Sequence, residues 1–70
     1  MDRTAVRSSN IRSVGYDPQA SVLEVEFHSG GVYQYYGAPE HIYQGFMRAP
    51  SKGAYFHDYT KDRYPCRQVR

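Results

Sequence analysis

The segment 21–36 constrains the fold more than any other part of the chain. Residues 22–27 alternate apolar and acidic side chains, which is the pattern of a half-buried strand. The Ser-Gly-Gly sequence at 29–31 supplies residues that take positive φ at little steric cost, as a tight turn requires. Residues 32–36 form a return strand that is rich in tyrosine. The segment therefore predicts an antiparallel β-hairpin.

A further strand is predicted upstream of the hairpin, over residues 11–16. Gly15 interrupts its apolar pattern and indicates a bulge or a close approach of another backbone segment. Asp17 and Pro18 then favour a type I turn, because Asp suits its first position and Pro its second. Short loops between consecutive strands predict that the three strands form a meander.

Two short helices are predicted after the sheet. Pro39 suits the first position of a helix, and an apolar stripe with helical spacing follows it. The stripe consists of Ile42, Tyr43, Phe46 and Met47. Gly45 weakens this helix by about 1 kcal/mol relative to alanine, so we expect close packing there. Pro50 ends the helix, and Ser51 caps a second one that includes residues 54–59.

These elements predict an α+β fold, in which a three-stranded antiparallel β-meander is followed by two short α-helices packed on one face. A single domain over 10–65 lies between a flexible N-terminal lead-in, 1–9, and a basic C-terminal tail, 66–70. The expected core consists of Leu23, Val25, Phe27, Tyr33, Tyr35, Ile42, Phe46 and Phe56. A three-stranded sheet has two edges, and we expect one of them to remain open for a partner.

Size and composition bound the function. A chain of 70 residues forms one domain and buries only about 60% of the surface that it exposes when unfolded. Its single cysteine, Cys66, excludes an internal disulfide, and its 3 histidines have no zinc-ligand spacing. No apolar run approaches the roughly 20 residues of a membrane span, so we expect a cytoplasmic protein without a membrane partner. No residue pattern pairs a nucleophile with a base, so we expect no enzymatic activity, cofactor or metal.

Charge is distributed unevenly along the chain. Residues 1–16 and 48–70 are basic, whereas residues 17–47 carry acidic side chains and no Lys or Arg. Two of the acidic residues, Glu24 and Glu26, share the polar face of their strand, where we expect them to serve solubility. If the two basic ends meet, their surface attracts a phosphate backbone; if they do not, the mixed charges only keep the protein in solution.

Several segments, read together, are similar to a known family. They are Ser8-Ser9-Asn10-Ile11, Val14-Gly15-Tyr16-Asp17, Leu23-Glu24-Val25-Glu26-Phe27, Ser29-Gly30-Gly31-Val32-Tyr33-Gln34-Tyr35, and Ala49-Pro50-Ser51-Lys52-Gly53 with Tyr55-Phe56. The set resembles the KTSC domain, which occurs at the C-terminus of some lysyl-tRNA synthetases and alone in small bacterial and phage proteins. The likeness runs from about Ser8 to Tyr64 and makes residues 10–65 a KTSC-like domain. The family brings no established biochemical activity, but its attachment to a tRNA synthetase implies a role in RNA binding.

Two functional hypotheses follow from these observations. In the first, the protein is a small non-enzymatic module that binds nucleic acid, either tRNA or single-stranded RNA, through a basic surface and exposed tyrosines. The residues predicted to bind are Arg12, Tyr36, Ser51, Lys52, Arg63 and Arg67. In the second, an open sheet edge or an aromatic patch binds another protein or a second copy of the chain.

Some of these residues keep two interpretations. Ser51 and Lys52 lie at a predicted helix start, where backbone N–H groups favour a phosphate, but Ser51 also suits a plain helix cap. Tyr33 and Tyr35 offer a platform for bases, but they lie on the apolar side of their strand and are expected to fill the core. Tyr36 points to the other face and is the better candidate for stacking on bases.

Overall fold

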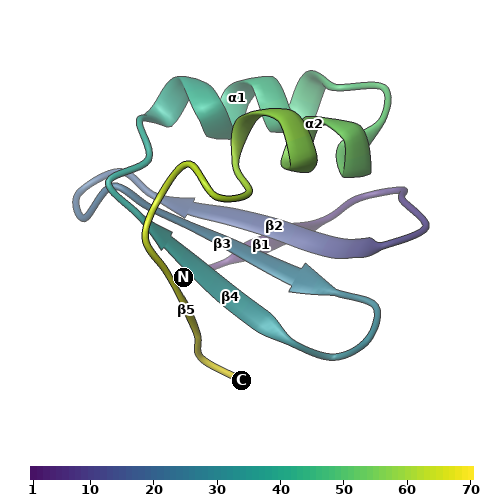
Figure 1. Cartoon of the computed structure of the whole chain (residues 1–70), viewed down its shortest axis with the longest axis horizontal. Helices are drawn as coiled ribbons and strands as arrows, with labels where there is room; N and C mark the ends of the chain where they lie inside the picture. Colours follow the sequence, from purple (N-terminus) through teal and green to yellow (C-terminus); the bar gives the residue numbers. More distant parts are fainter.

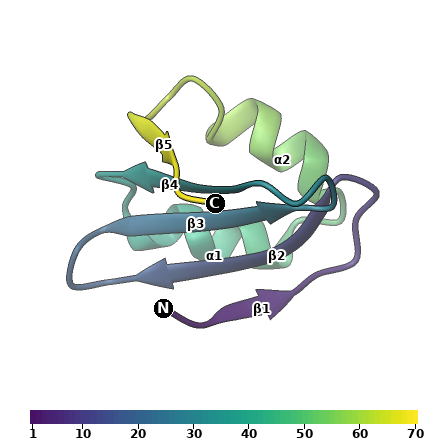
Figure 2. The ribbon, with the colours of Figure 1, turned by 90° about the horizontal axis from the view of Figure 1, so that it is seen from below.

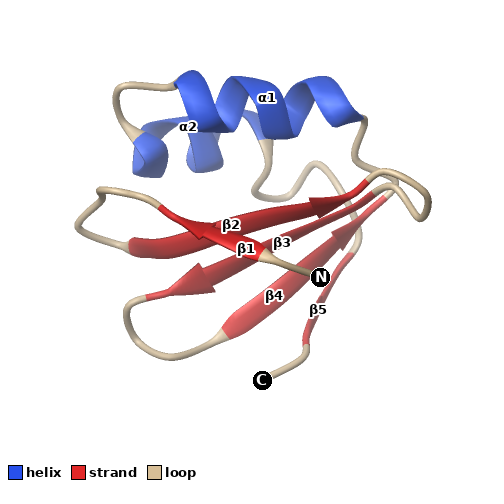
Figure 3. Cartoon of the chain, turned by 180° about the vertical axis from the view of Figure 1, so that it is seen from behind, coloured by secondary structure: helices blue, strands red, loops and turns tan.

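The computed structural model describes residues 1–70 and confirms the α+β class. The strands are β1 (Arg3–Ala5), β2 (Ile11–Asp17), β3 (Val22–Phe27), β4 (Val32–Tyr36) and β5 (Cys66–Gln68). The helices α1 (Glu40–Arg48) and α2 (Lys52–Tyr59) follow β4. All strands pair antiparallel in the order β1-β2-β3-β4-β5, and both helices cover the same face of this sheet (Figures 1 and 3).

The sheet has five strands, where the sequence predicted three. The two additional strands come from the segments expected to be a flexible lead-in and a basic tail, because residues 3–5 pair with β2 and residues 66–68 pair with β4. Both strands are three residues long and mostly exposed, so they lack the apolar alternation from which a strand is recognised in a sequence. The edges of the sheet are therefore β1 and β5, as Figure 2 shows.

The hairpin predicted over 21–36 is confirmed. Val25 pairs with Tyr33, and Glu24 pairs with Gln34, which places the apolar residues of β3 on the same face as Tyr33. Gly30 adopts a φ of 105° in the turn, a conformation that glycine reaches at little cost. This register directs one face of the hairpin towards the helices and leaves the other uncovered.

The core lies between the sheet and α1. It contains five of the predicted residues together with Ile11, Val14 and Ala38, which the sequence did not single out. The five are Leu23, Val25, Tyr35, Ile42 and Phe46. The other three predicted residues, Phe27, Tyr33 and Phe56, are only partly buried at its margin. Part of the aromatic surface therefore stays accessible at that margin.

Gly45 marks the closest approach of the two helices. The Tyr55 ring packs against it, and a Cβ atom at position 45 would lie only 2.9 Å from Tyr55 Cζ. The Tyr55 hydroxyl donates to the Ile42 carbonyl of α1 at 3.0 Å. The close packing predicted for Gly45 is thus confirmed.

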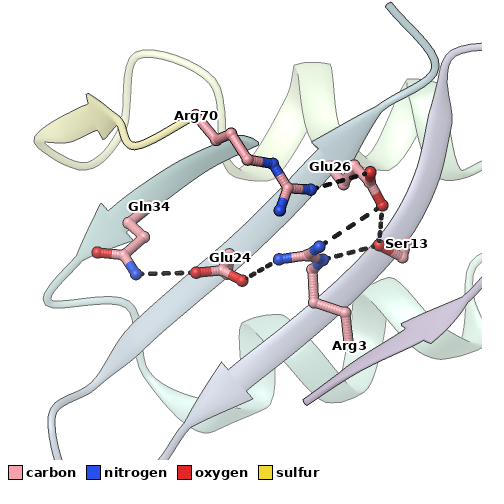
Figure 4. Close-up of polar contacts among 6 residues, drawn as sticks. All are labelled: Arg3, Ser13, Glu24, Glu26, Gln34 and Arg70. Atoms are coloured by element: carbon pink, nitrogen blue, oxygen red, sulfur yellow. Dashed lines mark hydrogen bonds and ion pairs between the residues drawn. The ribbon is translucent and has the colours of Figure 1, made fainter. Parts of the chain in front are cut away.

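The uncovered face of the sheet carries a polar network (Figure 4). The Arg3 guanidinium pairs with Glu24 and lies 3.7 Å from the Glu26 carboxylate. Arg70, at the other end of the chain, lies 3.5 Å from Glu26. Gln34 donates to Glu24 at 2.8 Å. The two glutamates therefore bind both ends of the chain, rather than serving solubility as the sequence predicted.

Burial of Glu24 is tolerated because of these partners. Glu24 is 7% exposed, and burial alone would raise the pKa of its carboxyl. Hydrogen bonds from Gln34 and Arg3, together with the Arg3 charge, outweigh burial and hold that pKa below its usual value. Gly15 makes room for this arrangement, because a Cβ there would lie 2.5 Å from the Asp2 carbonyl oxygen. The close backbone approach predicted at Gly15 is confirmed.

Candidate functional site

The residues predicted to bind nucleic acid do not converge on one surface. Arg12 is exposed on β2, where the register with β3 shifts, and Arg67 lies on β5 beyond two intervening strands. Arg67 pairs with Gln34, so both lie on the uncovered face of the sheet. Tyr36 shares that face, and its hydroxyl donates to Gln34 at 3.0 Å. Arg67 and Tyr36 are therefore on the side of the sheet opposite the helices.

Ser51 and Lys52 lie where α2 begins. They stabilise the end of α1 and the start of α2. The Ser51 hydroxyl accepts from the Ala54 N–H at 3.2 Å, which is the predicted helix cap. The Lys52 ammonium donates to the Ala49 carbonyl at 2.6 Å and to the Met47 carbonyl at 3.1 Å. A cation at this place balances the negative end of the α1 dipole. The Lys52 charge is therefore engaged within the fold.

Arg63 is also engaged by the backbone. Its Nε donates to the Asp58 carbonyl oxygen in the last turn of α2 at 2.8 Å. Lys61, which the sequence did not single out, takes part in none of the ion pairs of the chain. It lies two residues before Arg63 and lines a pocket beside α2.

Two adjoining pockets run along α2, at the margin of the core. The first has a volume of about 380 Å³ and the second about 360 Å³. Phe27, Ser29 and Phe56 line both pockets, so the two form one continuous groove. We call it the α2 groove. It lies on the helix-covered side of the sheet, away from Tyr36 and Arg67.

The two ends of the α2 groove differ in chemistry. The polar end is lined by Ser9, Asn10, His28 and Gly53 in addition to the shared residues. The aromatic end is lined by Tyr33, Tyr35, Lys61, Asp62 and Cys66. One end thus offers hydroxyl, amide and imidazole groups, and the other offers aromatic rings with two opposite charges beside them.

The aromatic rings form a fixed floor. Phe27 and Tyr33 meet edge to face with ring centroids 5.6 Å apart, and Phe27 meets Phe56 in the same way at 5.3 Å. Tyr35 packs edge to face on Phe56 at 5.7 Å. This geometry is the favoured one for aromatic pairs, and it holds the rings without closing the groove. Of the two tyrosines expected to fill the core, Tyr35 does so and Tyr33 is partly buried at its margin.

Other kinds of site find no support in the arrangement of side chains. No group of three or more His, Cys, Asp or Glu side chains is gathered where it could hold a metal ion. Neither helix has the length and apolar character needed to cross a bilayer. The α2 groove, whose lining combines aromatic rings with polar groups, is the candidate site.

Most of the groove is built from the segments that carry the family resemblance. The lining residues in those segments are Ser9, Asn10, Ile11, Phe27, Ser29, Tyr33, Tyr35, Gly53 and Phe56. The family model of the KTSC domain matches residues 7–64. The chain belongs to the KTSC family. The match leaves β1 and β5 outside, so the KTSC segment comprises β2 to β4 and both helices.

The relatives of this KTSC protein include free-standing chains and parts of larger enzymes. An uncharacterised protein of Stutzerimonas stutzeri is 42% identical over 64 residues, which is 91% of this chain and 90% of that protein. A lysine–tRNA ligase of a Nostoc species is 36% identical over 61 residues, 87% of this chain but 11% of the enzyme. The crystal structure of a KTSC domain protein from Yersinia pestis superposes with a TM-score of 0.96 at 45% identity, over 99% of this chain and 97% of that one.

Proposed function

We propose that this KTSC protein is a small module that binds single-stranded RNA in the α2 groove. The observation that carries the proposal is the floor of partly exposed rings, Phe27, Tyr33 and Phe56, with the Lys61 ammonium beside it. Unpaired bases stack on such rings and gain about 1–3 kcal/mol each. A nearby lysine attracts the phosphate that accompanies each base.

The polar end of the groove supports the same ligand. Gly53 lies in the first turn of α2, where backbone N–H groups have no partner within the helix and favour an anion. Asn10 flanks it with a further donor, whereas the His28 Nε2 already donates to the Ser8 carbonyl at 2.9 Å. A groove with stacking surface at one end and donors at the other suits a nucleotide, which carries a base and a phosphate.

The relatives give independent support. Several curated proteins that contain a segment similar to this chain are lysine–tRNA ligases, enzymes whose names identify tRNA as a substrate. The chain corresponds to 11% of the length of each, so the ligase activity is not carried over with the segment. An RNA-binding role fits both the appended segment and the free-standing chain.

The electrostatic part of binding should be small. Because Lys52 and Arg63 are engaged by carbonyl groups, we expect only one or two phosphates to be contacted by cations. Each such contact on a single strand contributes a log–log salt slope of about −0.7. Stacking therefore supplies most of the affinity, and binding persists at moderate salt.

A chemical-shift titration with a short oligouridylate, repeated at high salt, tests the proposal. The expected result is a set of shifts at the amides of Phe27, Tyr33, Phe56 and Lys61. Lys61→Gln should weaken binding and make the salt slope shallower by about 0.7. Arg67→Gln is the matched control, since Arg67 is equally exposed but lies on the uncovered face.

Two outcomes would contradict the proposal. One is the absence of shifts with RNA at low salt, and the other is a set of shifts confined to the uncovered face. A concentration-dependent dimer whose interface maps to β1 or β5 would instead favour the alternative of a protein-interaction module that pairs through a sheet edge.

A further inference from the structure

Tyr35 carries a hydroxyl that has no hydrogen-bond partner in the chain, although most of the residue is buried. The residue is 5% exposed and lines the aromatic end of the α2 groove. The hydroxyls of Tyr16 and Tyr55 donate to backbone carbonyls, and that of Tyr33 donates to Gln68. No such bond is formed by Tyr35. The only buried side-chain polar atom without a partner is Thr60 Oγ1, so the Tyr35 hydroxyl stays accessible at the groove, where it is free to donate to a ligand.

The hydroxyl is available as a donor at neutral pH. Burial raises the pKa of Tyr35 to about 12, with smaller effects from Cys66, Tyr33 and Asp62. All three of these neighbours line the same end of the groove, which places the hydroxyl among the groups that face a ligand there. A protonated phenol in the lining of a pocket favours a ligand that presents an acceptor.

The Tyr35 hydroxyl donor and the Asp62 carboxylate acceptor, which line the same end of the groove, determine which ligand edge fits there. In a nucleotide, the exocyclic group at position 4 of a pyrimidine or position 6 of a purine lies far from the sugar, and it reaches deepest into a pocket. This group is a carbonyl acceptor in uracil and guanine but an amino donor in cytosine and adenine. A donor opposite an amino group leaves both without a partner, which is costly in a buried site.

We propose that the aromatic end of the α2 groove is a pocket for one unstacked keto base, uracil or guanine, whose exocyclic carbonyl accepts from the Tyr35 hydroxyl. Asp62, at the exposed edge of the pocket, is placed to accept from the neighbouring ring N–H of the same bases. The pocket volume of about 360 Å³ lies within the range of roughly 300–1,000 Å³ found for small-ligand sites. This inference rests on the proposed function and adds a base preference to it.

Two oligonucleotides of equal length, an oligouridylate and an oligocytidylate, provide the test. They have the same charge and ring size and differ at the edge that meets Tyr35. The wild-type protein should bind the oligouridylate roughly tenfold more tightly. Tyr35→Phe keeps the ring and removes only the hydroxyl, so it should abolish most of this preference and weaken oligouridylate binding about two- to tenfold.

Two further variants complete the design. Tyr36→Phe removes a hydroxyl from the neighbouring residue on the uncovered face, and it should keep the preference for uracil. Asp62→Asn, at an exposed position, should reduce the preference without affecting folding. Thermal unfolding of Tyr35→Phe should match the wild type, because the hydroxyl has no partner to lose.

The outcomes separate this inference from the proposed function. A preference for uracil that is lost in Tyr35→Phe and kept in Tyr36→Phe supports the keto-base pocket. Binding of both oligonucleotides with equal affinity, or a preference that Tyr35→Phe retains, overturns the pocket and leaves RNA binding intact. If the wild type binds neither oligonucleotide at low salt, both conclusions fall.

Discussion

Gly45→Ala tests the packing of the two helices that shape the α2 groove. Alanine is favoured over glycine in a helix by about 1 kcal/mol, so propensity alone predicts a more stable protein. The structure predicts the opposite, because the new Cβ would lie 2.9 Å from Tyr55 Cζ and 3.1 Å from Tyr55 Cε2. Overpacking costs about 1–3 kcal/mol, and loss of the Tyr55 hydrogen bond to Ile42 costs about 1 kcal/mol more.

The net effect of Gly45→Ala should be a loss of about 1–3 kcal/mol in the free energy of unfolding. In a domain of this size each kcal/mol shifts Tm by roughly 4–8 °C, so Tm should fall by about 5–20 °C in a thermal melt followed by circular dichroism. Gly53→Ala is the matched control, since the nearest atom to its Cβ is Asn10 Nδ2 at an ordinary 3.6 Å. It should leave Tm unchanged or raise it. A Gly45→Ala protein as stable as the wild type would refute the packing argument.

Three further predictions concern charge and titration. Lys52→Met removes the ammonium from the Met47 and Ala49 carbonyls and should lower stability by about 1 kcal/mol, seen as a lower urea midpoint. The pKa of Glu24 is lower in the folded protein than its unfolded value of about 4.3, so its ionised form adds stability at higher pH. This stability is lost as pH falls through the folded pKa, and Glu24→Gln should therefore flatten the acid limb of a stability–pH curve. The pKa of Tyr35, raised to about 12, adds stability below pH 10 that is lost as pH rises towards 12; Tyr35→Phe should flatten that limb in alkaline denaturation. An unchanged limb in either variant would contradict the corresponding pKa direction.

The helices and strands whose side chains alternate between a buried and an exposed face could be predicted from the sequence. The hairpin over 21–36 and the stripe on α1 each repeat at the period of their element, so the buried faces followed directly. The edge strands β1 and β5 could not be predicted, because each has only three, mostly exposed residues and shows no alternation. Their pairing depends on backbone groups of β2 and β4 and on contacts of Arg3 and Arg70 with carboxylates distant in sequence.

None of the six residues predicted to bind nucleic acid lines the α2 groove; of the residues weighed in the sequence as a platform for bases, only Tyr33 and Tyr35 do. Sequence analysis counts cations but does not show which carbonyl groups they meet, and this is why Lys52 and Arg63 were expected on a basic surface. The tyrosines of β4 were assigned to the correct face. Their partial exposure depends on where α2 ends and where the chain turns after it. The same turn brings Lys61 to the groove. No local signal in the sequence contains that information.

The two ends of the chain determine the charge of the uncovered face. Arg3 and Arg70 lie outside the KTSC segment, yet both pair with Glu26, which lies inside it. The terminal strands thereby neutralise the acidic face, occupy two of the arginines and cover the edges of β2 and β4. Arg67 and Tyr36 remain on that face without an aromatic floor around them. Stacking surface and a cation without an ion pair, Lys61, meet in the α2 groove, and this is why the proposed RNA ligand is expected on the helix side of the sheet.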